Sequence, residues 1–464
     1  MWWVTLLAGG VYPWVWVPAA GVLLAVAIAV RAGIARSPLG RLLDAALVAG
    51  LVACLLQLVP LPPEMLQRFD PHAVTVRVAL WLPPVLAPPD RPWIPVSIAP
   101  YDTSAAAGIF LSTLVMFWTS RRIVEQGGTG RLVRAIAFIG LAASIAAIAQ
   151  RTQRIDLLYG FWRPLDAGAR PYGPFVNRNH FATWVIMACP LVFGYLLARA
   201  PRHTIPRDLS RRIANILKQL GSIRIWLVVS VCLMTLAVLL SASRSGLIGL
   251  LCGFALSTAL SRAHGTHHVR RWVVFQFTLL ALVLLWFANY DALLRRFEES
   301  VTAAQEGRGR VAIWRDALRL AGDFPVTGTG AGTFGKAIRV YQTAEPGYAI
   351  DQAHNQYLQL MAEGGAALLL PGMLAAGLFV ALAGRSLKQD FSSNHLIRAG
   401  ACAGIAGALV QSIWETGLTM PANAWLFAML GAIATHDSAT ESRTLPGSGA
   451  ADAQGWSGAP TPRD

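Results

Sequence analysis

An arginine in a tight turn is the first indication of chemistry in this sequence. Arg244 lies in the segment Ser241-Ala242-Ser243-Arg244-Ser245-Gly246, a very short connection between two long apolar stretches. Such a turn needs no arginine, whereas a guanidinium presents a planar fork of donors that fits a phosphate group. The neighbouring serine hydroxyls add donors, although they could equally cap the ends of helices. Arg244 is therefore a candidate phosphate ligand.

A second arginine, Arg310, opens a predicted helix over residues 309–321. Trp314 follows one turn later, a spacing that would set the aromatic ring at a membrane interface and aim the charge at headgroup depth. A lipid diphosphate would lie at that depth, although a solvated helix start explains the pattern nearly as well. The apolar side of this helix is predicted to contain Val311, Trp314, Leu318 and Ala321.

A histidine, His354, lies where a polar segment meets an apolar stretch. A lone histidine is usually structural, but an imidazole beside polar groups at a membrane mouth can accept a proton near neutral pH. Asp351 could orient the ring if a helix has already begun there. Glu363 is less suitable, since nine residues at about 100° each place it on the opposite side of a continuous helix. His354 is therefore the candidate general base.

Membrane-spanning helices must position these residues, because the composition argues against a soluble protein. Of the 464 residues, 55% are hydrophobic and only 14% are charged. About 20 apolar residues cross the hydrocarbon layer as a helix. Eleven such stretches begin near Tyr12, Leu42, Thr103, Leu132, Phe181, Ile225, Leu247, Val273, Gln356, Ile397 and Ala422. The sequence predicts an all-α polytopic membrane protein of about 11 or 12 transmembrane helices. The stub Met1 to Gly9 is too short to cross, so it is either a truncated first span or an interfacial segment.

The distribution of charge predicts the orientation. A formal net charge of +15 would suggest nucleic-acid binding in a soluble protein, but here the positions matter more than the sum. Basic residues cluster in alternate loops, which the positive-inside rule assigns to the cytoplasmic side. The loops left for the outer side are about 62–102, 150–180, 241–246, 290–354 and 415–421. We expect one membrane domain over residues 1–437 and a disordered cytoplasmic tail over residues 438–464.

Arginines nevertheless gather on the predicted outer side, which the charge rule should deplete. They are Arg151, Arg154, Arg163, Arg170, Arg178, Arg244, Arg295, Arg296, Arg308, Arg310, Arg315, Arg319 and Arg339. Any single one could snorkel at a helix end. The set favours an anionic ligand at the outer surface.

Three loops carry further expectations. Ten prolines in the loop 62–102 exclude regular helix and favour an extended cover that packs over another part of the protein. The GxGxxG pattern at residues 330–335 lacks a βαβ unit, so we interpret residues 328–335 as a tight loop whose backbone approaches another segment or a phosphate. The inner loop 199–224 is predicted to lie as a basic amphipathic helix on anionic membrane lipids.

Five short motifs follow one another at suitable spacing between about Arg170 and Gly377. They are Gly173-Pro174-Phe175-Val176-Asn177-Arg178-Asn179-His180-Phe181-Ala182, Ser241-Ala242-Ser243-Arg244-Ser245-Gly246, Arg310 with Trp314, Asp323-Phe324-Pro325-Val326-Thr327-Gly328-Thr329-Gly330, and Ala353-His354-Asn355-Gln356-Tyr357-Leu358 with Glu363. In these motifs the chain resembles the O-antigen ligase and O-antigen polymerase (Wzy-type) superfamily of bacterial membrane proteins.

The resemblance implies a GT-C-like membrane fold and a periplasmic site that accepts an undecaprenyl-diphosphate-linked glycan without a metal or other cofactor. Arg244 and Arg310 would hold the diphosphate, and His354 would assist the attacking sugar hydroxyl. Arg178 is added to the diphosphate ligands by extrapolation. The supporting residues would be Asn355, Asp351 and Tyr357. A direct displacement by the hydroxyl would make this an inverting glycosyltransferase.

Several alternatives stay open. Within the superfamily, a ligase uses lipid A core as acceptor and a polymerase uses another lipid-linked glycan, and a protein-glycosylating transferase is a third variant. The short first span and the proline-rich loop depart from the family pattern and leave the acceptor undecided. In another class, a lipid-linked glycan transporter or flippase would place ionisable groups near the bilayer midplane. Here the clear spans are nearly free of charge, which favours chemistry at the surface.

Overall fold

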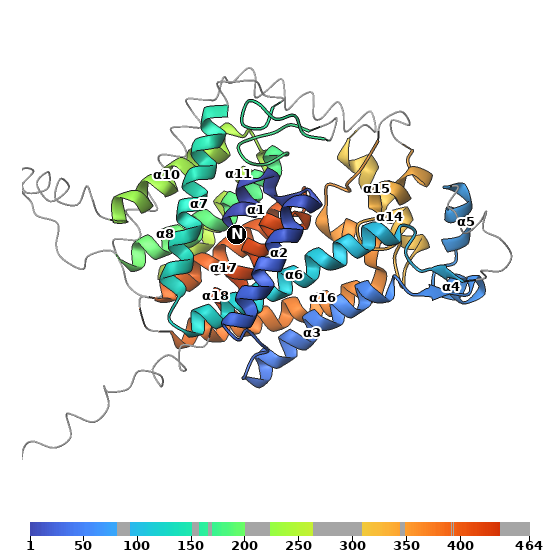
Figure 1. The fold of residues 1–464 in the computed structure, drawn as a ribbon, viewed down its shortest axis with the longest axis horizontal. Helices are drawn as coiled ribbons and strands as arrows, with labels where there is room; N and C mark the ends of the chain where they lie inside the picture. The colour runs from blue at the N-terminus through green and yellow to red at the C-terminus, as the bar shows by residue number, and fades with distance from the viewer. Residues whose placement is uncertain are drawn as a thin grey trace, which may run out of the picture.

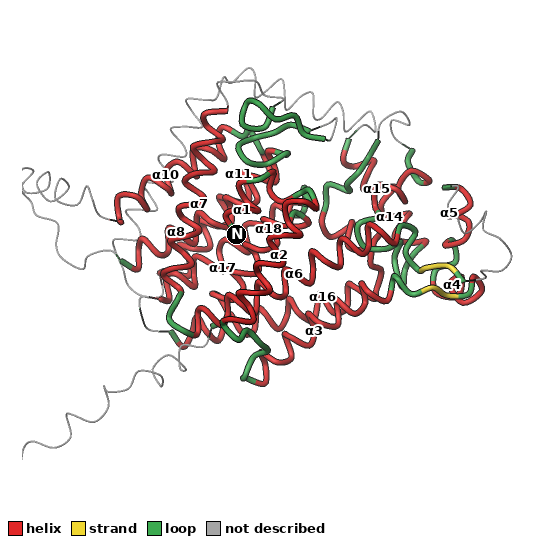
Figure 2. Tube along the Cα trace, in the orientation of Figure 1, coloured by secondary structure: helices red, strands yellow, loops and turns green. Residues whose placement is uncertain are grey.

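The computed structural model describes residues 1–80, 93–150, 157–165, 169–199, 223–262, 309–343, 349–390, 392 and 394–436. Within these residues the chain is helical almost throughout (Figures 1 and 2). The described sheet is a two-stranded ribbon in which β1 (Pro60–Leu61) pairs antiparallel with β2 (Ile94–Pro95). The predicted span near Val273, the inner loop 200–222 and the tail 437–464 lie outside the described residues.

Seven described helices are long and apolar enough to cross a membrane. They are α3 (Pro38–Leu56), α6 (Pro100–Glu125), α7 (Thr129–Gln150), α8 (Arg178–Ala198), α10 (Ile223–Leu240), α11 (Arg244–Arg262) and α16 (Gln356–Gln389). Three other helices occupy further predicted positions, namely α2 (Pro13–Ala29), α17 (Asn394–Gln411) and α18 (Pro421–Thr435). Four of these ten helices begin at a proline, whose missing N–H costs nothing at the first helical position. The chain is an all-α polytopic membrane protein, as predicted.

Helix α8 is the centre of the bundle and is buried along nearly its whole length. It packs closely against α17 because glycines stand at their contact. A Cβ atom on Gly194 would lie 2.2 Å from the carbonyl oxygen of Leu396, and one on Gly400 would lie 2.4 Å from that of Pro190. Small residues at helix contacts let two backbones approach closely. Such close packing drives helix association in lipid, where the hydrophobic effect does not.

Helix α16 is broken at Gly365, whose φ of 50° and ψ of −156° are not helical. The break frees backbone groups that would otherwise bond along the helix. The segment 325–335 supplies replacements, since the N–H groups of Ala366 and Ala367 donate to the carbonyls of Pro325 and Val326, both at 2.9 Å. Irregular backbone beside a spanning helix is tolerated where protein buries it in this way.

Short helices form a cap beyond the ends of α3, α6 and α16, at the right of Figure 1. They are α4 (Pro63–Phe69), α5 (Ala73–Ala79), α14 (Arg310–Asp323), α15 (Phe334–Ala337) and the 3-10 turn η3 (Ile338–Val340). A second hydrophobic cluster, separate from the bundle core, joins them through residues such as Leu66, Val76, Leu320 and Phe334. The described parts of the predicted cover, residues 62–80 and 93–102, therefore contribute to this cap.

The expectation that prolines exclude helix from this loop was wrong for α4 and α5. Pro62 and Pro63 stand at the N-cap and first position of α4, and Pro71 lies between the two helices. A proline at those positions loses no helical hydrogen bond. Residues 81–92, which contain five of the ten prolines, lie outside the described residues.

The predicted helix at Arg310 is confirmed as α14, but its buried face differs from the prediction. Val311 and Leu318 are more than half exposed, whereas Asp316, Ala317 and Leu320 are buried against the cap. The apolar pattern predicted the helix correctly, whereas contacts with α16 and η3 determine which of its sides is buried.

The stub at the N-terminus forms α1 (Trp2–Leu6) and the 3-10 turn η1 (Ala8–Gly10). Val4 and Thr5 are fully buried, and α1 packs against α7 and α18. The first ten residues are thus packed into the bundle and do not form a membrane-spanning helix of their own.

Candidate active site

Several segments meet at one end of the bundle, which we call the site end. Helices α8, α11 and α16 all begin there, and the segment 412–420 between α17 and α18 lies among them. The N–H of Gln356 donates to the carbonyl of Ser412 at 2.9 Å. The start of α11 packs on the start of α8, because a Cβ on Gly246 would lie 2.7 Å from that of Ala182.

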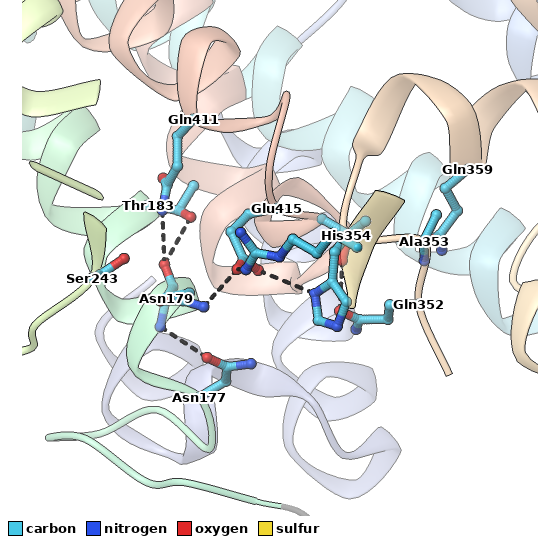
Figure 3. A network of polar contacts seen from close by, with 12 residues as sticks. Asn177, Asn179, Thr183, Ser243, Gln352, Ala353, His354, Gln359, Gln411 and Glu415 are labelled. Carbon is cyan, nitrogen blue, oxygen red and sulfur yellow. Dashed lines mark hydrogen bonds and ion pairs between the residues drawn. The ribbon is translucent and has the colours of Figure 1, made fainter. Parts of the chain in front are cut away.

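The carboxylate of Glu415 is the centre of a polar network at the site end (Figure 3). Its side chain is 1% exposed. Oε1 accepts hydrogen bonds from Nη2 of Arg310 at 2.7 Å and from Nδ2 of Asn179 at 2.5 Å. Oε2 lies 3.9 Å from Nδ1 of His354, which is within ion-pair range but beyond a hydrogen bond. Both of these facing atoms are buried and have no hydrogen-bond partner among the described residues.

His354 is held in an unusual backbone conformation, with a φ of +49°. The segments on both sides fix it there. The indole N–H of Trp314 donates to the carbonyl of Ala353 at 3.1 Å, and the N–H of Ala353 donates to Oε1 of Gln359 at 3.2 Å. On the other side, Asn355 caps α16 by accepting from the N–H groups of Tyr357 and Leu358. A left-handed residue that is not glycine persists where its surroundings over-determine it, and such residues cluster at functional sites.

The glycine-rich loop 328–335 approaches another segment, as one of the two predicted alternatives stated. That segment is α16, and the contact is the carboxylate of Glu363. It accepts from the N–H groups of Gly332 at 2.9 Å and Phe334 at 3.1 Å, and from Nε2 of Gln359 at 3.1 Å. Because Gln359 also holds Ala353, the loop, the break in α16 and the His354 segment form one connected support.

Three helices at the site end start with an arginine. Arg178 opens α8, Arg244 opens α11 and Arg310 opens α14. The helix dipole opposes a cation in the first turn by about 0.3–1 kcal/mol, so stability alone does not favour these positions. Arg178 is half-buried, Arg244 is exposed, and 39% of the Arg310 side chain is exposed. Guanidinium groups and helix N-termini together create a positive potential that suits an anion.

The structure brings two of the predicted site residues together and gives others a local role. His354 and Arg310 share the carboxylate of Glu415, while Arg244 and Arg178 lie at the starts of adjacent helices. Asn355 is the N-cap of α16.

Two predicted supporting residues lie away from the Glu415 contacts. The hydroxyl of Tyr357 donates to the carbonyl of Leu409 at 2.8 Å. Asp351 is exposed and stands in the loop before α16, because the helix begins only at Gln356. The carboxylate beside His354 is that of Glu415.

The charge of Glu415 depends on its neighbours. Burial alone would raise the pKa of this carboxyl, but the nearby His354, His180 and Arg310 outweigh burial and hold the pKa below its ordinary value of 4.5. Glu415 is therefore a carboxylate at neutral pH. Within the described part of the chain, no three His, Cys, Asp or Glu side chains lie together in a way that could hold a metal ion.

Sequence reasoning missed Glu415 and the part played by Asn179. The signal for Glu415 was available, since it is an acidic residue in a short loop between two apolar stretches. This is the same argument that singled out Arg244. The signal for Asn179 was weaker, because 236 positions separate it from Glu415.

Comparison with protein families agrees with four of the five motifs, since the first, at residues 173–182, lies outside the matched region. Residues 229–376 match the family described as O-antigen ligase. The matched region contains Arg244, Arg310 and His354, and it ends before Glu415. No curated protein matches the chain. Over residues 229–376 the chain is similar to the O-antigen ligase family, which supports the resemblance to the O-antigen ligase and polymerase superfamily.

Proposed function

We propose that the protein transfers a glycan from undecaprenyl diphosphate to a sugar hydroxyl at the periplasmic face of the bacterial inner membrane, with lipid A core as the acceptor. The match of residues 229–376 to the O-antigen ligase family supports a ligase or polymerase activity in general. The geometry of the site end supports the chemistry. The observation that carries the proposal is the pairing of His354 and Arg310 with one buried carboxylate, where arginines open three helices.

In this proposal the three arginines bind the donor. Arg178, Arg244 and Arg310 neutralise the diphosphate, together with the N-terminal amides of their helices. As the bond between the anomeric carbon and the diphosphate oxygen breaks, negative charge grows on the leaving group. Donors already in place for that charge stabilise the transition state more than the ground state.

His354 is the proposed general base. It accepts the proton of the acceptor hydroxyl as that oxygen forms its bond to the anomeric carbon. The electron pair of the broken carbon–oxygen bond leaves with undecaprenyl diphosphate. One displacement inverts the anomeric configuration, so NMR of the product tests this step directly, and a retained configuration would exclude it. No outer Asp-x-Asp pair is present in the sequence, and we propose that no divalent metal is required.

The test in cells uses the lipopolysaccharide of a deletion strain. The strain is complemented with wild type, Arg244→Ala or His354→Ala, and each protein is shown to be present in the membrane. We expect wild type to restore long-chain glycan on lipid A core and both variants to fail. Normal banding in the deletion strain would rule out this acceptor. Loss of chain length instead of loss of attachment would identify a polymerase, and accumulation of undelivered lipid-linked glycan would identify a transporter.

A further inference from the structure

Glu415 lies beside two residues, Arg310 and His354, which have different roles in the proposed mechanism. Arg310 must bind the leaving diphosphate, and His354 must take a proton. In the structure Arg310 bonds to Oε1 at 2.7 Å, while His354 stands 3.9 Å from Oε2. The arginine is therefore engaged with the carboxylate, and the histidine is not yet within hydrogen-bond distance of it.

The two atoms that face each other are complementary. Oε2 of Glu415 is an acceptor and Nδ1 of His354 can be a donor, and both are buried without a hydrogen-bond partner among the described residues. A buried donor or acceptor without a hydrogen-bond partner destabilises the protein. A small movement that brings Nδ1 within hydrogen-bond distance of Oε2 is therefore favourable. Arg310 can move away without leaving Oε1 unpaired, because Nδ2 of Asn179 also donates to that oxygen at 2.5 Å.

Arg310 is placed to change partners. Its side chain is 39% exposed, whereas that of Glu415 is 1% exposed. A guanidinium has five N–H donors, and a diphosphate that approaches from the open side offers it a second, more highly charged acceptor. The other titratable group that acts on Glu415 is His180, which is buried at the start of α8.

We propose that Glu415 is a positioning residue that exchanges partners when donor binds. The diphosphate draws Arg310 away, and Glu415 then accepts the Nδ1–H of His354. That hydrogen bond leaves Nε2 of His354 free to take the hydroxyl proton and stabilises the imidazolium that forms. The Arg310–Glu415 pair thus keeps the base unoriented until donor is present. This inference rests on the proposed function.

The exchange predicts that one substitution has opposite effects on binding and turnover. In Glu415→Gln, Arg310 is released from its ion pair, so undecaprenyl diphosphate should bind about 1.5-fold to fivefold more tightly, the range that a partly exposed ion pair supports. Turnover with saturating donor should fall roughly 10- to 100-fold, the loss that follows when the hydrogen-bond partner orienting a metal-binding histidine is removed. A merely structural role would not tighten binding.

The experiment measures both quantities on the purified full-length protein. Undecaprenyl diphosphate binding is followed by calorimetry in detergent, and kcat by transfer from a lipid-linked donor. Glu125→Gln is the matched control, since this carboxylate pairs with Arg122 away from the site. In an Arg310→Ala background, Glu415→Gln should no longer tighten binding. If Glu415→Gln does not fold, Glu415→Asp, which withdraws the carboxylate by one methylene, should lower kcat without weakening binding.

The possible outcomes distinguish a failure of the partner exchange from a failure of the proposed function. Unchanged or weaker binding in Glu415→Gln, or unchanged kcat, overturns the exchange while wild-type transfer leaves the proposed function standing. Wild type that neither binds undecaprenyl diphosphate nor transfers glycan overturns both.

Discussion

Replacing Glu363 by alanine should weaken the fold at the break in α16. The carboxylate accepts from two backbone N–H groups, those of Gly332 and Phe334, and from the amide of Gln359. Without it, two backbone donors lose their acceptor in a buried setting at about 1–3 kcal/mol each, which gives about 2–6 kcal/mol. The lower half of that range is expected, since the substitution also removes the cost of burying a charge. Glu363→Gln keeps one acceptor oxygen and should cost about half as much.

The assay is equilibrium unfolding of purified protein in mixed micelles with increasing SDS, followed by tryptophan fluorescence. Glu125→Gln, a partly exposed carboxylate away from the site end, is the control and should change the unfolding free energy by less than about 0.5 kcal/mol. A Glu363→Ala protein as stable as that control would refute the reasoning, because it would mean that the bonds to the 328–335 loop contribute nothing.

Three further predictions follow from the structure. Gly328→Ala should destabilise the protein by more than about 2 kcal/mol or prevent folding, because φ is +69° and a Cβ would lie 2.3 Å from the backbone of Glu363. Its control is Gly372→Ala, where a Cβ meets no atom within 4 Å, and this variant should be neutral or stabilising in the same unfolding assay. Arg77→Met should loosen the cap by roughly 2–4 kcal/mol, since its buried Nη2 donates to the carbonyls of residues 95, 96 and 97, and limited proteolysis between residues 60 and 99 should speed up. The pKa of Glu415 is depressed in the folded state, so its contribution to stability is present above the ordinary pKa of 4.5 and is lost as the pH falls through the folded value. The stability difference between wild type and Glu415→Gln should therefore shrink below pH 4.5, and a difference that grows on acidification would contradict the sign of the shift.

Composition predicted most of the fold because a spanning helix needs only a long apolar stretch. Ten of the eleven predicted spans correspond to described helices, and the eleventh lies outside the described residues. Helix α14 was also predicted, from the spacing of its apolar residues after Arg310. Its inward face was not, because Val311 and Leu318 are as apolar as the residues that the cap buries. Only tertiary contacts distinguish them.

The candidate site was predicted in its parts and not in its connections. Arg244, Arg310 and His354 stood out because their residue types were unexpected at those positions. Their common partner could not be predicted from spacing, since Glu415 lies 105 positions from Arg310 along the chain. The helix start at Gln356 likewise decides that Asp351 stays in a loop. Long-range pairing depends on how the helices pack, which the local sequence does not contain.

The most direct test of the account is glycan transfer by purified protein in the presence of EDTA. The protein is given an undecaprenyl-diphosphate-linked glycan and lipid A core, and wild type is compared with Arg310→Ala, His354→Ala and Glu125→Gln. We expect transfer by wild type and Glu125→Gln, and a loss of at least about 100-fold in the other two, as for a general base and a leaving-group ligand. Transfer by His354→Ala at the wild-type rate, or no transfer by wild type to any glycan acceptor, would contradict it.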